Sequence, residues 1–227
     1  MPFSPKTLDF LFENKFNNSK EWFHAHKDAY QQDVMQPLIE LTDQLAPAIC
    51  KIDPQIVVIP KTTKSICRIY RDTRFTKDKS IYRSNMWLIF IRDKKESQLP
   101  GFYVDISPNG LEYGVGNYQC EPETMRVYRE MILRQEPEFM SALQAYQKQR
   151  KFKLYGERYK RSKALDQPEI IRDWLDRKCT GVSHFTDDFD LIFSDRLYRT
   201  ISRDFLRIKP IYDFYLAVYA RLDHNER

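Results

Sequence analysis

Residues 101–118 read GFYVDISPNGLEYGVGNY, and this stretch decides the class of fold. Two runs rich in β-branched and aromatic residues flank the sequence Pro108-Asn109-Gly110. An Asn-Gly pair between two such runs is typical of a tight turn that joins antiparallel strands. The stretch therefore predicts a β-hairpin.

Further strand signals lie upstream of the hairpin. Residues 56–60 (IVVIP) and 65–71 (SICRIYR) are β-rich, and residues 85–93 (NMWLIFIRD) are apolar at successive positions along both faces of a strand. A strand that is covered on both faces is typical of the middle of a sheet, so we expect 85–93 to be central. Because short connections join these runs, the sequence predicts a mainly antiparallel sheet of about four to five strands within residues 56–118.

Helical patterns lie on both sides of these strands. Asn18, three residues before Glu21, resembles the capping box of a helix that runs from about residue 19 to 52 and bends near Pro37. After the strands, helices are expected over residues 122–134, 137–151 and 167–178, and again from about 189 to the C-terminus.

This order of elements indicates an α+β protein, with C-terminal helices packed on the sheet. We expect one domain over residues 1–227, with 1–52 helical, 56–118 forming the sheet and 121–227 mainly helical. A chain of 227 residues with 14% aromatic side chains is large enough to build one sizeable core.

The composition narrows the classes of function. No GxGxxG, GxxxxGK[ST], GxSxG or HExxH pattern occurs, so nucleotide loops and the common hydrolase sites have no sequence support. The cysteines at 50, 67, 120 and 179 form no CxxC pair, which predicts free thiols in a reducing compartment. Without a signal peptide or an apolar run long enough to cross a bilayer, the sequence predicts a cytoplasmic protein with no membrane partner.

Positive charge is concentrated in two segments of the chain. The formal net charge is +5, yet residues 61–95 carry a net +8 and residues 148–163 a net +7, so the remainder is acidic. Such segregation fits a basic surface that binds a phosphate group or a polyanion, although solvated surfaces produce it as well.

The densest charge lies in residues 71–83, RDTRFTKDKSIYR, between two of the expected strands. Arginine binds phosphate and carboxylate groups through two parallel hydrogen bonds, and serine and tyrosine hydroxyls add donors. Phe75 or Tyr82 has a ring able to stack on a base. The predicted ligand-binding residues of this loop, taken as residues 68–83, are Arg68, Arg71, Arg74, Lys77, Lys79, Ser80, Tyr82 and Arg83.

Three functions fit this loop, and the sequence leaves them open. The first is binding of an anionic small molecule, a nucleotide or a nucleic acid. The second is an enzyme for a small anionic or phosphorylated substrate, in which Asp72 or Asp78 acts as a base or holds Mg²⁺. The third is a structural or interaction module in which the same two carboxylates brace the arginines as ion pairs.

Two other basic regions have a simpler interpretation. Residues 147–163 interleave cations with aromatic rings, which is typical of a nucleic-acid surface but equally of a solvated one. Four arginines, at helical spacing, form one stripe opposite an apolar stripe, as an ordinary amphipathic helix does. They are Arg196, Arg199, Arg203 and Arg207.

The histidines predict no metal site. His24 and His26 are two residues apart, whereas ligands on one helix require a spacing of three or four. No cofactor is evident from the sequence, and Mg²⁺ held by Asp72 or Asp78 is the one that we keep open.

Five segments of the chain follow a recognisable pattern. They are NNSKEWFHAHKDAY (17–30), RIYRDTRFTKDKSIYRSN (68–85), GFYVDISPNG (101–110), YGVGNY (113–118) and REMI (129–132). In these segments the chain resembles the family known as domain of unknown function 2461. The central segment carries most of the resemblance, although the family pattern has a proline where this chain has Ile81. The resemblance implies a shared fold and no established activity.

Overall fold

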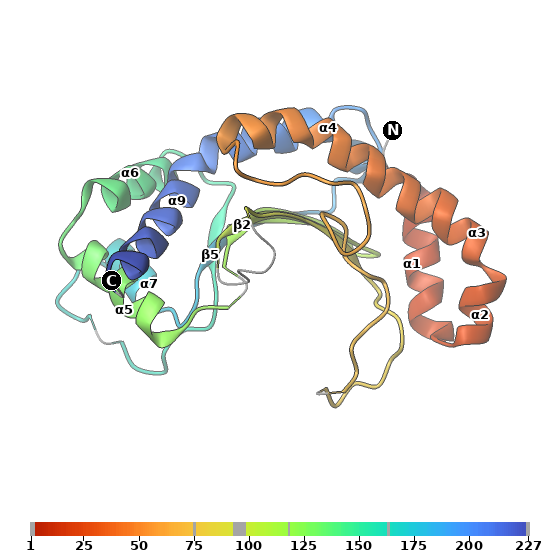
Figure 1. Ribbon diagram of the computed structural model, residues 1–227, viewed down its shortest axis with the longest axis horizontal. Coiled ribbons are helices and arrows are strands. Elements are labelled where there is room, and N and C mark those ends of the chain that lie inside the picture. Colours follow the sequence, from red (N-terminus) through yellow and green to blue (C-terminus); the bar gives the residue numbers. More distant parts are fainter. Residues whose placement is uncertain (1–2, 75, 93–98, 118, 163, 226–227) are drawn as a thin grey trace. The chain divides into compact units, whose positions relative to one another are not determined.

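The computed structural model describes residues 3–74, 76–92, 99–117, 119–162 and 164–225 (Figure 1). Five strands form an antiparallel sheet in the order β1-β2-β3-β5-β4. The expected α+β class, with helices before and after the sheet, is confirmed. The strands are β1 (Met86–Phe90), β2 (Gly101–Ser107), β3 (Gly110–Gly116), β4 (Lys153–Tyr155) and β5 (Gly181–Thr186).

The helices lie near their expected positions. Before the sheet come α1 (Pro5–Asn17), α2 (Lys20–Ala25), α3 (Lys27–Ala29), the π-helix η1 (Tyr30–Met35) and α4 (Gln36–Ile52). After β3 come α5 (Pro122–Leu133), α6 (Pro137–Gln147), α7 (Glu169–Leu175), α8 (Phe189–Ile192) and α9 (Leu197–Asn225). The single helix expected over 19–52 is thus divided, with the π-helix directly before the bend expected near Pro37.

The predicted hairpin is confirmed as β2 and β3. Its two connecting residues are Pro108 and Asn109, and Gly110 follows with a φ of +141°. A Cβ atom on Gly110 would also lie 2.5 Å from the carbonyl oxygen of Thr186. Both the backbone conformation and the close neighbour therefore require glycine at this position.

Two of the strand predictions are wrong in part. Residues 56–60 form no strand, because the carbonyl of Ile59 accepts local hydrogen bonds from Lys61 and Ser65 instead of bonds from a neighbouring strand. β1 ends the strand order and is not central. On its other edge, a short piece of the predicted strand 65–71 adds an antiparallel bridge between Ile66 and Leu88.

The missing strands come from the part of the chain expected to be mainly helical. β4 pairs with β5 in antiparallel register, with Leu154 opposite Val182. β5 also adjoins β3, where a Cβ atom on Gly114 would lie 2.0 Å from the carbonyl oxygen of Val182. Glycine therefore permits a close approach between segments that are far apart in sequence.

The chain divides into two compact units. Unit 1 contains residues 1–90, 103–113 and 185–203, and unit 2 contains residues 91–102, 114–184 and 204–227. In unit 1, α4 packs on β1, and α1 lies beside η1 (Figure 1). The fully buried side chains at this core include Leu38, Leu41, Leu45, Ile49, Met86, Leu88 and Phe90.

Unit 2 has an aromatic core. Trp174 of α7 is fully buried and meets Phe139 of α6 edge to face, with ring centroids 5.6 Å apart. Phe214 of α9 contacts Phe139 at 5.4 Å and Tyr128 of α5 at 5.3 Å. Aromatic pairs of this kind add to the stabilisation from burial itself, so these rings fix α5, α6, α7 and α9 against one another.

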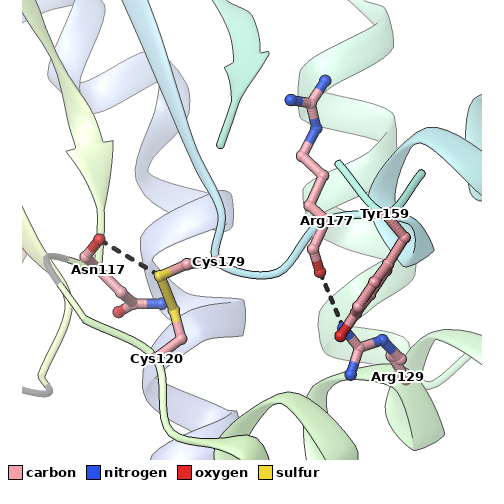
Figure 2. The surroundings of a disulfide bond; sticks show 6 residues. All are labelled: Asn117, Cys120, Arg129, Tyr159, Arg177 and Cys179. Carbon is pink, nitrogen blue, oxygen red and sulfur yellow. Dashed lines mark hydrogen bonds between the residues drawn. A yellow bond between two sulfur atoms is a disulfide. The ribbon is translucent and has the colours of Figure 1, made fainter. Parts of the chain in front are cut away.

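A disulfide in unit 2 corrects the prediction that all four cysteines are free thiols. Cys120, before α5, is bonded to Cys179, before β5, and their Cα atoms are 5.3 Å apart (Figure 2). The two cysteines are separated by 59 residues, so no local spacing of cysteines predicts the bond. Cys50 and Cys67 are not disulfide-bonded, as expected.

Candidate functional site

The base of the basic loop, residues 68–83, is a short antiparallel ribbon. Tyr70 and Tyr82 form an isolated bridge. The amide of Arg71 donates to the carbonyl of Ile81, and the amide of Arg83 donates to the carbonyl of Ile69, both at 2.9 Å. The two arms therefore run side by side away from the sheet (Figure 1).

Two asparagines of the N-terminal helices clamp one arm of this ribbon. Asn14 is fully buried, and its amide donates to the carbonyl of Arg83 at 2.8 Å. The side chain of Asn18 accepts from the amides of Ile81 and Tyr82 at 2.6 and 3.1 Å, and donates to the carbonyl of Tyr82 at 2.9 Å. The bond from Ile81 uses an N–H that a proline in its place would lack.

The role expected for Asn18 as the N-cap of the following helix is wrong, and Asn18 is the C-cap of α1. Ser19 is the N-cap of α2, and its hydroxyl accepts from the amide of Trp22 at 3.2 Å. Asn18 is instead tied to the loop, 63 and 64 residues away, a use that no local pattern indicates.

Aromatic packing holds the same ribbon from one side. Tyr82 is only 4% exposed, and its ring stacks on that of Phe23 with centroids 4.3 Å apart. Tyr70 meets Tyr82 edge to face at 5.1 Å. Tyr82 thus lies in the packed base of the loop, and Phe75, the other ring considered for stacking, lies outside the described residues.

Each carboxylate of the loop is paired with one arginine. Asp78 accepts from Arg71, which also donates to the hydroxyl of Ser80 at 2.7 Å. Asp72 accepts from Arg74 at 2.7 Å. Both aspartates are solvent-exposed ion-pair partners that link neighbouring turns of the loop.

These bonds keep both carboxylates ionised. Hydrogen bonds from the side chain and then the backbone of Arg74 lower the pKa of Asp72 to about 2. Hydrogen bonds from the backbone and hydroxyl of Ser80, followed by Arg71, lower the pKa of Asp78 to about 2. A carboxylate with so low a pKa is a weak proton acceptor at neutral pH, which disfavours general-base chemistry at either residue.

The remaining cations of the loop have different surroundings. Lys77 is exposed, and the ammonium group of Lys79 donates to the neutral carbonyl of Thr73 at 2.9 Å. Arg68 is exposed near Asp72, on which its charge acts. Arg83 packs its guanidinium over the ring of Trp87, 4.6 Å from the centroid.

A second group of polar side chains lies beside Arg83 on the face of the sheet. The amide of Asn85 donates to a carboxylate oxygen of Asp105 on β2 at 2.7 Å. The hydroxyl of Tyr103, two residues before Asp105, donates to Glu112 on β3 at 2.6 Å. We call these residues, together with Arg83, the sheet-face cluster.

Asp105 is the most perturbed acid of this cluster. Burial raises the pKa of its carboxyl to about 7, and the charge of Glu112 acts in the same direction, whereas Asn85 and Arg83 oppose the rise. A carboxyl that titrates near neutral pH is typical of sites that bind ligands or transfer protons.

Of this cluster, only Arg83 was predicted from the sequence as a site residue. The available signal was the alternation within GFYVDIS, where Phe102, Val104 and Ile106 are buried and Tyr103 and Asp105 therefore share the other face. Asn85 and Glu112 lie beside Tyr103 and Asp105 because three strands pair in the sheet. The alternation within one strand does not predict that pairing.

Two cations of the second basic segment form ion pairs within the fold. In segment 147–163, Lys151 pairs with the buried Asp204 at 2.5 Å, and Arg158 pairs with Asp173. The amphipathic interpretation of α9 is confirmed by the full burial of Leu197, Ile201, Phe205 and Ile208, opposite the arginine stripe.

One arginine of that stripe lines a pocket in unit 2. Arg207 and Pro210 of α9 face Ser141, Gln144, Ala145 and Lys148 across a cavity of about 310 Å³. Within the part of the stripe in unit 1, Arg199 donates to the hydroxyl of Tyr198 at 3.0 Å. The arginines of this stripe therefore lie in different local environments.

The polar contacts near the disulfide hold elements of unit 2 together. Arg129 of α5 donates to the carbonyls of Leu175 and Arg177 at 3.2 and 2.8 Å and to the hydroxyl of Tyr159 at 3.1 Å (Figure 2). It also donates to the carbonyl of Met125 within α5 at 3.0 Å. Its guanidinium thus has four neutral acceptors, three of which tie α5 to the segment around α7.

Within the described ranges, no three His, Cys, Asp or Glu side chains come together in an arrangement able to hold a metal ion. None of the helices that the structure describes is both long and apolar enough to cross a bilayer.

Fold and loop together define an α+β protein whose basic loop is braced by its own carboxylates and clamped by asparagines next to the sheet. Residues 6–214 match the model of a conserved hypothetical protein family, DUF2461. The chain belongs to this family, as the sequence resemblance predicted. None of the curated proteins compared with the chain matches it. Membership carries no activity with it, because the family's function is unknown.

Proposed function

We propose that the basic loop binds a phosphate-bearing or other anionic ligand, and that the ligand is a nucleotide or a nucleic acid. The observation that supports this proposal is the charge left after internal pairing. Asp72 and Asp78 each pair with one arginine, whereas Lys77 and Lys79 have no carboxylate partner within the described part of the chain.

The pairing itself suits a binding loop. The carboxylates hold Arg71 and Arg74 in place, and the asparagine clamp fixes the base of the ribbon. A ligand that meets donors already in position loses less conformational freedom on binding. Lysine ammonium groups contribute point charges, and arginine guanidinium groups add directed hydrogen bonds to phosphate oxygens.

The test uses two double variants with the same change of charge. Lys77→Gln/Lys79→Gln removes the unpaired loop cations, and Lys6→Gln/Lys51→Gln removes exposed cations of α1 and α4. Fluorescence anisotropy with a labelled single-stranded oligonucleotide gives the dependence of affinity on salt. Each phosphate contact contributes about 0.7 to the logarithmic slope, so the loop variant should lower it by about 1.4 while the control leaves it unchanged.

Small ligands complete the test. A thermal-shift assay with ATP and with inorganic phosphate should raise the melting temperature of the unmodified protein more than that of the loop variant. If the protein binds neither the oligonucleotide nor ATP nor phosphate, the proposal is wrong.

An ion-pair brace is the second candidate function of the loop. The pairs Arg71–Asp78 and Arg74–Asp72 favour it directly. In that case Asp72→Ala lowers the melting temperature but leaves the binding of every probe unchanged. Lys77→Gln/Lys79→Gln, which breaks neither pair, should then change neither property.

The third candidate function is an enzyme acting on a small anionic substrate. The residue that supports it is Asp105, and not Asp72 or Asp78. Asp72 and Asp78 are weak bases, with pKa values of about 2. Asp105, with a pKa of about 7, is the described acid of unit 1 best suited to exchange protons near neutral pH. Its neighbour Arg83 belongs to the basic loop, which connects proton exchange with anion binding.

A further inference from the structure

Arg83 is a cation that the fold holds in a fixed position. Its amide donates to Ile69 at 2.9 Å, its carbonyl accepts from Asn14 at 2.8 Å, and its guanidinium lies over Trp87. The Nε atom is buried without a hydrogen-bond partner, and among the described residues Arg83 makes no ion pair. The side chain as a whole is only partly buried, and a guanidinium held in position without an ion pair is a binding element for an oxyanion.

Asp105 lies close enough for the charge of Arg83 to act on it, yet the two do not form an ion pair within the described chain. One carboxylate oxygen accepts from Asn85 at 2.7 Å. The charged groups that act on Asp105 are Arg83, from the arm of the loop, and Glu112, from the neighbouring strand. Glu112 in turn accepts from Tyr103 at 2.6 Å, so each acid of the pair is held by a neutral donor.

We propose that Arg83 and Asp105 form a site that takes up one small oxyanion together with one proton. This inference rests on the proposed binding of anions by the basic loop. The ligand class is a phosphate, sulfate or carboxylate group, free or as part of a larger molecule, that reaches the guanidinium of Arg83 beside the ring of Trp87.

The two protonation states of Asp105 have opposite effects on such an anion. An ionised Asp105 repels it and offsets the positive potential of Arg83. A protonated Asp105 removes that repulsion and offers an O–H donor in place of a lone pair. By linkage, an anion that prefers the protonated state also raises the pKa of Asp105 when it binds.

The size of the effect follows from the fraction of protein that is competent to bind. With a pKa of about 7, most Asp105 carboxyls are protonated at pH 6 and roughly one in ten at pH 8. If only the protonated state binds, the affinity should fall about tenfold between those two values.

Sulfate is the probe that isolates this effect, because its own charge does not change between pH 6 and pH 8, whereas that of phosphate does. Isothermal titration calorimetry at fixed ionic strength should give sulfate an affinity about tenfold higher at the lower pH. Asp105→Asn, which mimics the protonated side chain in shape and lack of charge, should bind with nearly equal affinity at both. Arg83→Gln should lose sulfate binding at both.

Two further measurements distinguish a direct effect on sulfate binding from the misfolding of a variant. Glu112→Gln removes the like charge, so the pH at which sulfate affinity falls should move downward while Asp105 itself is intact. In the unmodified protein, the ¹³C resonance of the Asp105 carboxyl should titrate at higher pH when sulfate is present.

The outcomes separate this inference from the proposed function. If sulfate binds equally at both pH values, if Asp105→Asn keeps the pH dependence, or if sulfate leaves the titration of Asp105 unchanged, the inference is overturned while anion binding stands. The same holds if the protein binds the oligonucleotide or ATP but not sulfate. If it binds none of the three, both proposals fall.

Discussion

Asp105→Asn should stabilise the protein above neutral pH. The carboxyl of Asp105 has its pKa raised from 3.8 to about 7, mainly by burial and secondarily by the charge of Glu112. Ionising this group in the folded protein therefore costs free energy that ionising it in the unfolded chain does not. Asparagine has nearly the same shape, never ionises, and keeps an oxygen that accepts the hydrogen bond from Asn85.

The sign and magnitude follow from proton linkage. Between pH 4 and pH 7 the unfolded chain has released the proton of Asp105 and the folded protein still binds it, so the free energy of unfolding falls as pH rises. The full shift from 3.8 to about 7 corresponds to an upper limit of about 4 kcal/mol. Because the side chain is only partly buried and water screens its charge, we expect about 2 kcal/mol.

Urea unfolding at a series of pH values measures this effect. At pH 8, in a buffer without sulfate or phosphate, the free energy of unfolding of Asp105→Asn should exceed that of the unmodified protein by about 2 kcal/mol. Near pH 4 the two free energies should agree. Asp9→Asn, which changes an exposed carboxylate of α1, serves as the matched control and should show no gain. Equal stabilities of Asp105→Asn and the unmodified protein at pH 8 would refute the reasoning.

Three other substitutions test the fold and the base of the loop. Asn14→Ala deprives the carbonyl of Arg83 of a buried hydrogen bond and should cost about 1–3 kcal/mol in urea unfolding. Gly116→Ala would place a Cβ atom 2.5 Å from the hydroxyl of Tyr155, and overpacking of this kind should lower stability by about 1–3 kcal/mol in thermal melts. Lys151→Met removes the cation paired with the buried Asp204 and should cost about 3 kcal/mol in urea unfolding.

The parts of the fold that were predicted correctly have local causes. The hairpin follows from Pro108-Asn109-Gly110, whose turn needs the positive φ of Gly110. The starts of α5 and α6 follow from Pro122 and Pro137, which occupy the first helical position. Each of these signals lies within a few residues of the structure that it produces.

The parts that were missed depend on distant partners. β4 has only three residues, and it exists because Leu154 lies opposite Val182 of β5. The disulfide joins Cys120 to Cys179 across 59 residues. A segment as short as β4 has no periodicity of its own, so its state is set by tertiary pairing and not by propensity.

The same distinction applies to the candidate site. The cations of the basic loop are a property of composition and were predicted residue by residue, although their binding role stays a prediction. The pKa of Asp105 is a property of surroundings, because burial and the approach of Glu112, Asn85 and Arg83 determine it. A sequence reports that an aspartate is present, but only the paired strands determine how readily it ionises.

The structure also divides the cations of the loop into two groups, which the sequence does not distinguish. Within residues 71–83, Arg71 and Arg74 are paired with the two carboxylates, and pairing at exposed positions contributes mainly geometry. Lys77, Lys79 and Arg83 lack such partners in the described chain, and they account for the net positive charge of the segment. Because Arg83 alone among these three is anchored through both its backbone and its ring contact, it is the cation whose position an incoming anion need not organise. An anion would therefore gain most from contact with Arg83, and the protonation of Asp105 beside it would decide how much of that gain is realised.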